Sequence, residues 1–397
     1  MEQFRKILEK DFVKNIQNSG GQIYFVGGAV RDYLLGLEPK DIDLVVTKLS
    51  FASLSELLTK FGKIDLVGQS FGIIIFTEKS TGEKYEIALP RKDYKGEGRG
   101  HKDIEVYSDP FLPIETDLFR RDFSINSIAL DSKLKFIDPY KGRDHIKRQL
   151  IQATSPESFT DDPLRMLRGL MFASRLKFAL SHKTFKLIKN DSKLIKEISK
   201  ERILQEFKKV FDKNGDIILF IHQLIQTDLF SNIFGFELSG YEFRFEKCKT
   251  LGQFLSLIIS KKDEKFLLKF KEEFKIDNDL YKEIRAHYKL FKLKHDFSFD
   301  SLYYKKYLFE ILQIFPDIIK SKFFLSKMLS DKFVMGVYPK SLKELPISGD
   351  DLISLGYEQG EKIGLTLKEI LDEVLADKLL ISDKEGALKL LKPPICK

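Results

Sequence analysis

The spacing of apolar residues along the sequence divides the chain into two parts. In the first part, apolar residues recur at the spacing of one helix face, which predicts a helix over residues 1–20. Short apolar runs bounded by glycine and polar clusters then favour strands. The expected strands are residues 22–26, 41–46, 72–77 and 84–89, with a helix at 29–35. We therefore expect a mixed α/β unit with a small sheet over residues 22–138.

The second part of the chain carries a helical pattern almost throughout. Between residues 163 and 335, leucine, isoleucine and phenylalanine recur at helical spacing among many lysines, and strand signals are scarce. A last segment, residues 338–397, is set apart by Pro339 and Pro346 and carries a turn-helix pattern. The pattern as a whole predicts the α+β class, with a small mixed-sheet domain followed by all-α segments.

Composition and charge narrow the class of protein. Hydrophobic residues make up 43% of the 397, so the chain can bury a sizeable core and is not wholly disordered. The two cysteines lie far apart without a CxxC partner, which excludes a disulfide framework and a cysteine zinc site. No apolar run is long enough to span a membrane, and the charged N-terminus lacks a signal-peptide core, so we expect a cytoplasmic protein. A net charge of +8 suits a polyanionic partner, although a lysine-rich genome would give the same excess.

The first candidate site joins a glycine turn to a pair of carboxylates. Gly27 and Gly28 end the first expected strand, so the backbone can approach a phosphate at the start of the next helix. Arg31 in that helix can bind phosphate in a bidentate manner. Asp41 and Asp43 are two residues apart on an expected strand and point to one face, where a cation such as Mg²⁺ would neutralise them. The alternative is a solvated surface pair.

Glu86 is the candidate third carboxylate. It interrupts an apolar strand, so it faces either the site, where a two-metal centre would use it, or solvent at a sheet edge. The segment after it, residues 91–103, is polar and glycine-rich and favours no secondary structure. We expect a mobile loop there, inside the α/β unit.

A second candidate cluster combines arginines with an aspartate and an asparagine. Arg121, beside Arg120, can neutralise a triphosphate. Asp122 and Asn126 are four residues apart, so they share one face if the segment is helical and can hold a ribose hydroxyl. The alternative is a structural Arg–Asp pair.

A third candidate cluster opens the helical part of the chain. Asp162, Arg165 and Arg168 follow one another at three-residue spacing on one helix face. A carboxylate and a guanidinium together offer an acceptor and donors to the edge of a nucleobase. The alternative is an ordinary capped helix, because Pro163 suits the first turn and Asp161 or Asp162 suits the N-cap.

Together these segments resemble the family of class II CCA-adding tRNA nucleotidyltransferases and bacterial poly(A) polymerases, within the polymerase-β-like nucleotidyltransferase superfamily. Residues 25–32 with Asp41 and Asp43 are similar to the family's metal-binding motif. Residues 120–123 are similar to its ribose motif, and residues 161–165 to its amino-acid template, where the family usually has glutamate first. Further similarity lies at the family's hinge and at the helix that supports the template, residues 138–142 and 201–206.

The resemblance implies a catalytic head, a neck with a base-reading template helix, a helical body and a tRNA-binding tail. These four parts would cover residues 1–138, 139–215, 216–335 and 336–397. Residues 347–364 are similar to the tail of the tRNA-processing members, which extends the resemblance to most of the chain.

The implied activity is template-independent addition of C, C and A to the 3′ end of tRNA, from CTP and ATP. Mg²⁺ would be held at Asp41 and Asp43, with Glu86 as a further catalytic carboxylate. The nucleotide would be bound by Gly27, Gly28, Arg31, Arg121, Asp122, Asn126, Asp162, Arg165 and Arg168, the last three at the base. The basic body and tail would grip the acceptor arm and elbow of the tRNA.

The sequence leaves three alternatives open: an A-adding enzyme, a poly(A) polymerase and, from another class, a non-catalytic RNA-binding protein. The tail favours tRNA, and the presence of both Asp41 and Asp43 argues against loss of catalysis. A Rossmann dinucleotide site is excluded, because the glycine pair is not part of a GxGxxG motif. The oligomeric state, and whether a partner enzyme divides the C and A additions, are left open.

Overall fold

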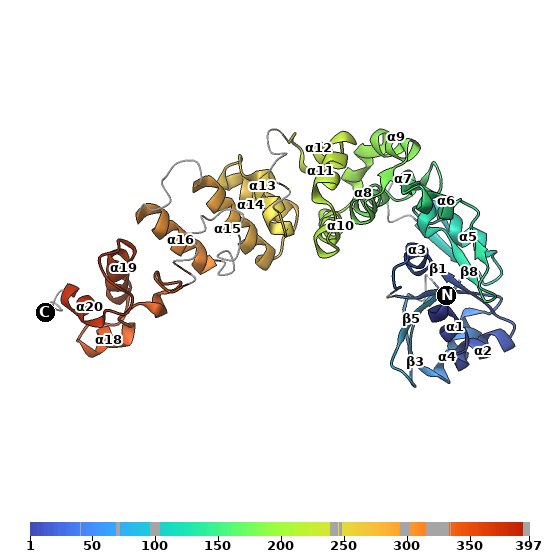
Figure 1. Cartoon of the computed structure of the whole chain (residues 1–397), viewed down its shortest axis with the longest axis horizontal. Coiled ribbons are helices and arrows are strands. Elements are labelled where there is room, and N and C mark those ends of the chain that lie inside the picture. Colours follow the sequence, from blue (N-terminus) through green and yellow to red (C-terminus); the bar gives the residue numbers. More distant parts are fainter. Residues whose placement is uncertain are drawn as a thin grey trace. The chain divides into compact units, whose positions relative to one another are not determined.

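The computed structural model describes the chain in ranges separated by gaps, and its contacts divide it into two compact units, Met1–Ser239 and Gly240–Lys397 (Figure 1). The four-part division expected from the resemblance stays a prediction. The described residues are 1–39, 41–68, 72–95, 104–238, 245, 248–293, 302–314, 333 and 335–391.

A seven-stranded mixed sheet forms the centre of the first unit, in the order β3-β4-β5-β2-β1-β8-β9. β2 and β5 are parallel neighbours, and the other neighbouring pairs are antiparallel. The strands are Gln22–Val26 (β1), Asp43–Thr47 (β2), Gly62–Gly68 (β3), Ile73–Glu78 (β4), Lys84–Ala88 (β5), Ala129–Asp131 (β8) and Phe136–Ile137 (β9). The expected mixed sheet is confirmed, although β3, β8 and β9 were not predicted and β2 begins two residues later than expected.

Three helices of the first unit lie together near the N-terminus and cover one face of the sheet (Figure 1). The ring of Phe12 in α2 lies 4.9 Å from the ring of Phe76 in β4, which ties this layer to the sheet. The predicted single helix over residues 1–20 is wrong, because the backbone is extended at Lys10 and divides it in two. The helices are α1 (Glu2–Leu8), α2 (Asp11–Asn18) and α4 (Phe51–Thr59).

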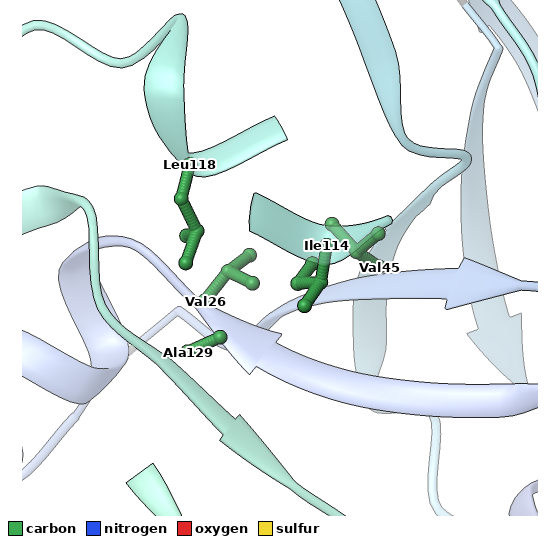
Figure 2. Close-up of a cluster of buried hydrophobic side chains, with 5 residues drawn as sticks. All are labelled: Val26, Val45, Ile114, Leu118 and Ala129. Atoms are coloured by element: carbon green, nitrogen blue, oxygen red, sulfur yellow. The ribbon is translucent and has the colours of Figure 1, made fainter. Parts of the chain in front are cut away.

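The other face of the sheet packs on α5 (Ile114–Phe119) through a small apolar cluster (Figure 2). Its buried members are Val26, Val45, Ile114, Leu118 and Ala129. Asp43 is the register partner of Val26 and lies two residues before Val45, so its side chain projects from this same face. The core on this face therefore fixes where the carboxylate points.

A two-stranded hairpin corrects the expected loop at residues 91–103. Arg91–Lys95 (β6) pairs antiparallel with Ile104–Ser108 (β7), so the first five residues of that segment form a strand. Residues 96–103 lie outside the described part of the chain. Its first strand, Arg91–Lys95, lacks the apolar alternation by which strands are recognised in a sequence.

The rest of the first unit is helical apart from two short strands, Leu150–Ile151 (β10) and Ala179–Leu180 (β11), which pair in parallel. These strands are an exception to the expected all-α part. The helices are α3 (Gly28–Leu34), α6 (Gly142–Lys147), α7 (Ser158–Asp161), α8 (Leu164–Leu176), α9 (His182–Asp191), α10 (Lys200–Asp212), α11 (Ile217–Gln226) and α12 (Leu229–Phe234). Two 3-10 turns, η3 (Ser124–Asn126) and η4 (Ser192–Glu197), complete it.

The second unit contains helices and turns and no strand within its described residues. Its helices are α13 (Leu251–Ile259), α14 (Glu264–Glu273), α15 (Asn278–Leu293), α16 (Leu302–Ile314), α18 (Gly349–Ser354), α19 (Glu361–Leu375) and α20 (Lys384–Leu390), with the 3-10 turn η7 (Leu342–Glu344). The buried Lys305 in α16 donates to the Leu375 carbonyl at 3.1 Å and to Asp377 at 2.5 Å, which fastens α16 to the end of α19. Among the described residues, no helix has the length and apolar character needed to cross a bilayer.

Candidate active site

A polar cavity of about 1090 Å³ lies in the first unit, between the sheet, α3 and the helices α8 and α10. All the candidate residues expected from the sequence line it: Gly27, Gly28, Arg31, Asp41, Asp43, Glu86, Arg121, Asp122, Asn126, Asp162, Arg165 and Arg168. They come from segments up to 141 positions apart, from Gly27 to Arg168, and the fold brings them to one place. The spatial grouping expected from the sequence is therefore present, and each residue's role follows from its contacts.

An acidic corner occupies one wall of the cavity. The parallel register of β2 and β5 places Asp43 beside Glu86, so the two side chains project from the same face. Burial and the negative charge of Glu86 raise the pKa of Asp43 to about 6, against the opposing effect of the Arg121 guanidinium. Asp41 is exposed and precedes β2, so the expectation that both aspartates stand on the strand is wrong for Asp41.

The acidic corner has the donor set of a hard divalent cation. Burial first, and then the charges of Glu86 and Asp41, raise the pKa of Asp43, and a bound cation would favour its ionised form. Among the described residues, no three acidic, histidine or cysteine side chains are grouped so as to enclose a metal ion. Mg²⁺ is commonly held by one or two carboxylates together with substrate phosphates and water, so an open pair of this kind fits such an ion.

The glycine turn leaves space for an arginine beside the acidic corner. Gly27 has a φ of +69°, and a Cβ at this position would lie 2.8 Å from Nη1 of Arg121 and 3.5 Å from Oδ2 of Asp43. Backbone conformation and close approach therefore both require glycine here. The turn, a cation and a carboxylate converge at a single corner of the cavity.

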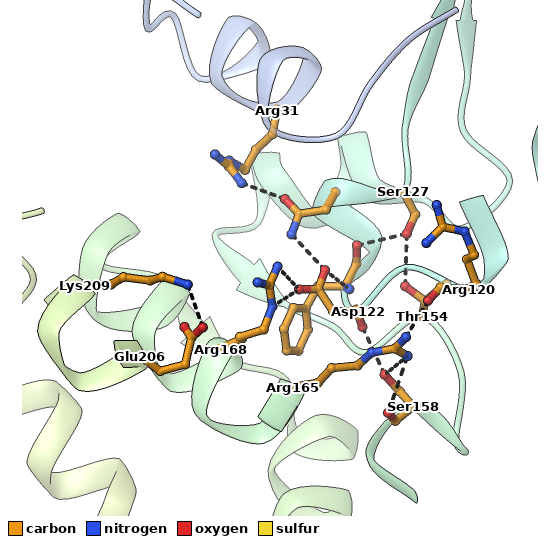
Figure 3. A network of polar contacts seen from close by, with 12 residues as sticks. Arg31, Arg120, Asp122, Ser127, Thr154, Ser158, Arg165, Arg168, Glu206 and Lys209 are labelled. Carbon is orange, nitrogen blue, oxygen red and sulfur yellow. Dashed lines mark hydrogen bonds and ion pairs between the residues drawn. The ribbon is translucent and has the colours of Figure 1, made fainter. Parts of the chain in front are cut away.

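A chain of hydrogen bonds connects the glycine-turn helix α3 to helix α8 (Figure 3). Arg31 donates from Nη1 to Oδ1 of Asn126 at 2.7 Å, and Asn126 donates from Nδ2 to Oδ1 of Asp122 at 2.9 Å. Arg168 donates from Nε to Oδ2 of Asp122 at 2.8 Å. Burial acts to raise the pKa of Asp122, but the Arg168 guanidinium and the Asn126 amide hold it below its usual range.

This network corrects the geometry expected for Asp122 and Asn126. They do not share the face of an α-helix, because Asp122 precedes a three-residue 3-10 turn and bonds directly to Asn126. Phe172 strengthens the same connection, since its ring lies 5.2 Å from Cζ of Arg31 and 5.6 Å from Cζ of Arg168. In sequence, Phe172 gave no signal beyond a buried position on an apolar helix.

The start of α8 lines the cavity and also carries the main-chain contact expected of a capped helix. Asp162 lines the cavity, and its Oδ1 also accepts the backbone N–H of Leu164 at 3.1 Å. Arg165 donates from Nη2 to the Arg120 carbonyl at 2.8 Å and from Nη1 to Oγ of Ser158 at 3.3 Å (Figure 3). These contacts hold the guanidinium at the cavity wall.

Several cations that line the cavity were not singled out in the sequence as nucleotide ligands. They are Arg91, Arg120, Arg175, Arg202, Lys209 and Lys213. Burial and the neighbouring cations Arg175 and Lys209 lower the pKa of Lys213. Lys209 also binds the buried Glu206 at 2.6 Å within α10 (Figure 3). The helix α10 packs against α8, as expected for residues 201–206. The spacing of Arg202, Lys209 and Lys213 on one helix face was the available signal.

Comparison with known proteins agrees with this geometry. Residues 23–152 match the model of the poly A polymerase head domain, and residues 177–236 match the probable RNA and SrmB-binding site of polymerase A. The fold and the site thus define a nucleotidyltransferase.

Two curated relatives match over nearly their whole length. A CCA-adding enzyme of Anoxybacillus flavithermus is 30% identical over 390 residues, covering 94% of this chain and 92% of the relative. A CCA-adding enzyme of Ligilactobacillus salivarius is 31% identical over 420 residues, covering 99% and 98%. The chain belongs to the family of CCA-adding enzymes and poly(A) polymerases, which confirms the resemblance found in the sequence.

Solved structures share the fold. The Bacillus stearothermophilus CCA-adding enzyme in complex with CTP has a TM-score of 0.72 at 23% identity and covers 97% of both chains. The Thermotoga maritima CCA-adding enzyme complexed with tRNA_CCA has a TM-score of 0.73 at 22% identity, covering 98% of this chain and 95% of that one. The α+β class expected from the sequence is confirmed by this likeness.

Proposed function

We propose that this chain adds C, C and A to the 3′ end of tRNA, taking CTP and ATP without a nucleic-acid template. The observation that carries the proposal is the cavity, in which acidic residues, a glycine turn and arginines from the sheet and from α8 share one space. Relatives of nearly the same length are named CCA-adding enzymes. Structures of that fold have been solved with CTP, with ATP and with tRNA_CCA.

The acidic corner would hold Mg²⁺ through Asp41 and Asp43, with Glu86 beside them. Such an ion, when bound, activates the RNA 3′-hydroxyl and stabilises the charge on the leaving pyrophosphate. Arg31 and Arg121 would bind the triphosphate, and the Gly27–Gly28 turn would let its oxygens approach the backbone. Their positive charge offsets the repulsion between the triphosphate and the carboxylates.

Selection of the base would rest with Asp162 and Arg165, with Arg168 beside them. Adenine and cytosine each present an exocyclic amine next to a ring nitrogen, and a carboxylate with a guanidinium matches both. Guanine and uracil present a carbonyl there, which would leave the carboxylate unpaired at a cost of about 1–3 kcal/mol. A guanidinium has five N–H donors, so the bonds of Arg165 to Ser158 and Arg120 leave others for the base.

The RNA would be bound mainly through its phosphates. A net charge of +8 and the basic helices of the second part of the chain suit the acceptor arm and elbow of tRNA. A tRNA substrate supports the cytoplasmic location expected from the sequence.

The test of this function compares RNA substrates. The full chain is incubated with Mg²⁺, CTP and ATP and either a tRNA transcript that lacks its CCA end or an unstructured RNA of equal length. We expect extension of the tRNA alone. Equal, continuing A-tailing of both RNAs would identify a poly(A) polymerase, and no extension of either would favour a non-catalytic RNA-binding protein.

A further inference from the structure

A fully buried carboxylate in α5 lies behind the two adjacent arginines of the cavity. Asp117 has no exposed surface and binds each arginine with a different oxygen. Arg120 donates to Oδ1 from Nε at 2.9 Å and from Nη2 at 2.7 Å. Arg121 donates to Oδ2 from Nε at 3.2 Å and from Nη2 at 2.9 Å. One carboxylate therefore fixes two guanidinium groups, each of which donates two N–H groups to a single oxygen.

Because Nε and Nη2 of Arg121 both donate to Asp117, the third nitrogen of its guanidinium is left directed at the glycine turn. Nη1 of Arg121 lies 2.8 Å from the position that a Cβ of Gly27 would occupy, and Oδ2 of Asp43 lies 3.5 Å from that position. In the part of the chain that the structure describes, Asp117 is the acceptor of every hydrogen bond that Arg121 donates. Although Arg121 is close to Asp43, the two form no ion pair within 4 Å in that part.

We propose that Asp117 is a positioning residue for the triphosphate. It acts through Arg121 in two ways: it directs Nη1 towards the glycine turn, and it prevents the guanidinium from pairing with Asp43. Without this buried partner, Arg121 would be able to pair with the nearby Asp43, and such a pair would remove both groups from the substrate. This inference rests on the proposed function, because it takes that corner of the cavity as the triphosphate site.

The test measures equilibrium binding of CTP and of CMP to the full chain by calorimetry, without RNA, so that no turnover occurs. For Asp117→Asn we expect the Kd of CTP to rise about tenfold or more, the loss typical of a misplaced charged donor. The Kd of CMP, which lacks the β- and γ-phosphates, should change by less than about threefold. In an Arg121→Ala background the Asp117→Asn change should have no further effect on CTP, since the residue acts through Arg121.

Glu78→Gln is the matched control. Glu78 is also buried in the first unit and binds a cation, Lys10, at 2.6 Å, but it does not line the cavity. It should alter thermal unfolding without changing the ratio of the two dissociation constants. If Asp117→Asn does not unfold cooperatively, Asp117→Glu replaces it, because that variant keeps the charge and moves the carboxylate by one methylene.

The outcomes separate the inference from the proposed function. If a folded Asp117 variant keeps the wild-type ratio of the Kd of CTP to the Kd of CMP, the positioning role is overturned and the proposed function is not affected. A loss shared equally by CTP and CMP also overturns it, because a general structural defect explains that result. Absence of CTP binding by the wild-type chain contradicts the proposed function itself, and the inference falls with it.

Discussion

At the scale of single residues, three arginines of the cavity are held by buried partners before any ligand arrives. Arg121 is held by Asp117, and Arg168 is held by Asp122. Arg31 binds Asp32 at 2.7 Å and Asn126 at the same distance. Charges held in place do not have to reorganise when the triphosphate binds, so their interaction with it is not reduced by that cost.

The exposed carboxylate Asp41 provides a test of the acidic corner. Asp41→Ala should lower nucleotide transfer about a thousandfold, because several kcal/mol of transition-state stabilisation depend on the metal that these carboxylates would hold. Stability should hardly change, since the side chain is exposed. Single-turnover extension and thermal unfolding measure the two effects.

The matched control for this prediction is Asp65→Ala. Asp65 lies on β3, is 46% exposed and does not line the cavity. Transfer by Asp41→Ala at a rate close to that of Asp65→Ala would refute the assignment of Asp41 to the metal.

Arg165 provides a test of base selection. Arg165→Ala should narrow the preference for CTP and ATP over GTP and UTP by about tenfold, because one charged donor to the base edge is lost. The measured quantity is the ratio of kcat/KM values among the four nucleotides, which a uniform loss of activity leaves unchanged. Arg148→Ala, at an arginine 64% exposed and outside the cavity, is the control. Unaltered selectivity in Arg165→Ala would remove its base-reading role.

At the scale of elements, the sequence predicted four strands of the sheet, β1, β2, β4 and β5, and missed β3, β8 and β9. β1, β4 and β5 were predicted because apolar residues fill or alternate along them. β6 was missed because Arg91–Lys95 is polar at nearly every position and pairs with one strand only. The break between α1 and α2 was missed because Phe4 and Phe12 face the same core on either side of it. Apolar periodicity is what reveals a strand in a sequence, so a strand of mostly polar residues is not recognised from it.

The packing of α8 against residue 123 provides a test at this scale. A Cβ at Gly169 would lie 2.8 Å from Cζ of Phe123, whose ring is itself buried between Phe159 and Phe172. Gly169→Ala should therefore destabilise the first unit by about 1–3 kcal/mol, despite the higher helix propensity of alanine. Thermal or denaturant unfolding of the full chain measures this.

Gly364→Ala is the matched control in another helix. Gly364 lies in α19, and nothing is within 4 Å of the position that its Cβ would take. This substitution should stabilise the second unit by about 1 kcal/mol through helix propensity alone. Equal effects of the two substitutions would show that close packing on Phe123 is not what requires glycine at 169.

At the scale of the whole molecule, the sequence predicted the members of the site better than their contacts. Every candidate residue lines one cavity. These residues could be chosen from the sequence because their types and their order match the motifs of the family. Asp117, Phe172 and Lys209 were not predicted as part of it, since a buried aspartate, an apolar helix position and a helical lysine are common in any protein. Their importance depends on which distant residues fold against them, and a single sequence does not encode that in a local pattern.

The second unit should respond to pH through a buried histidine. Burial lowers the pKa of His287 in α15 to about 4 from an ordinary 6.5, although Nδ1 donates to the Glu283 carbonyl at 2.9 Å. Between these values the unfolded chain binds a proton that the folded chain does not, so stability falls as pH falls. At pH 5.5 the loss should be about 1.4 kcal/mol relative to pH 7.5.

The measurement is the free energy of unfolding at the two pH values for wild type and His287→Gln. The variant should lack this part of the pH dependence, whereas His222→Gln, at an exposed position on α11, should retain it. The same pH dependence in wild type and His287→Gln would rule out His287 as its source.

The most direct measurement of the central claim is stepwise extension of three tRNA transcripts by the full chain with Mg²⁺ and one nucleotide at a time. One transcript lacks the CCA end, one stops after the first C and one after the second. The account predicts C on the first, C on the second, one A on the third, and then no further addition. Extension of the third transcript alone would show an A-adding enzyme, and A-tailing that continues past the first A would contradict selection by a cavity of this kind.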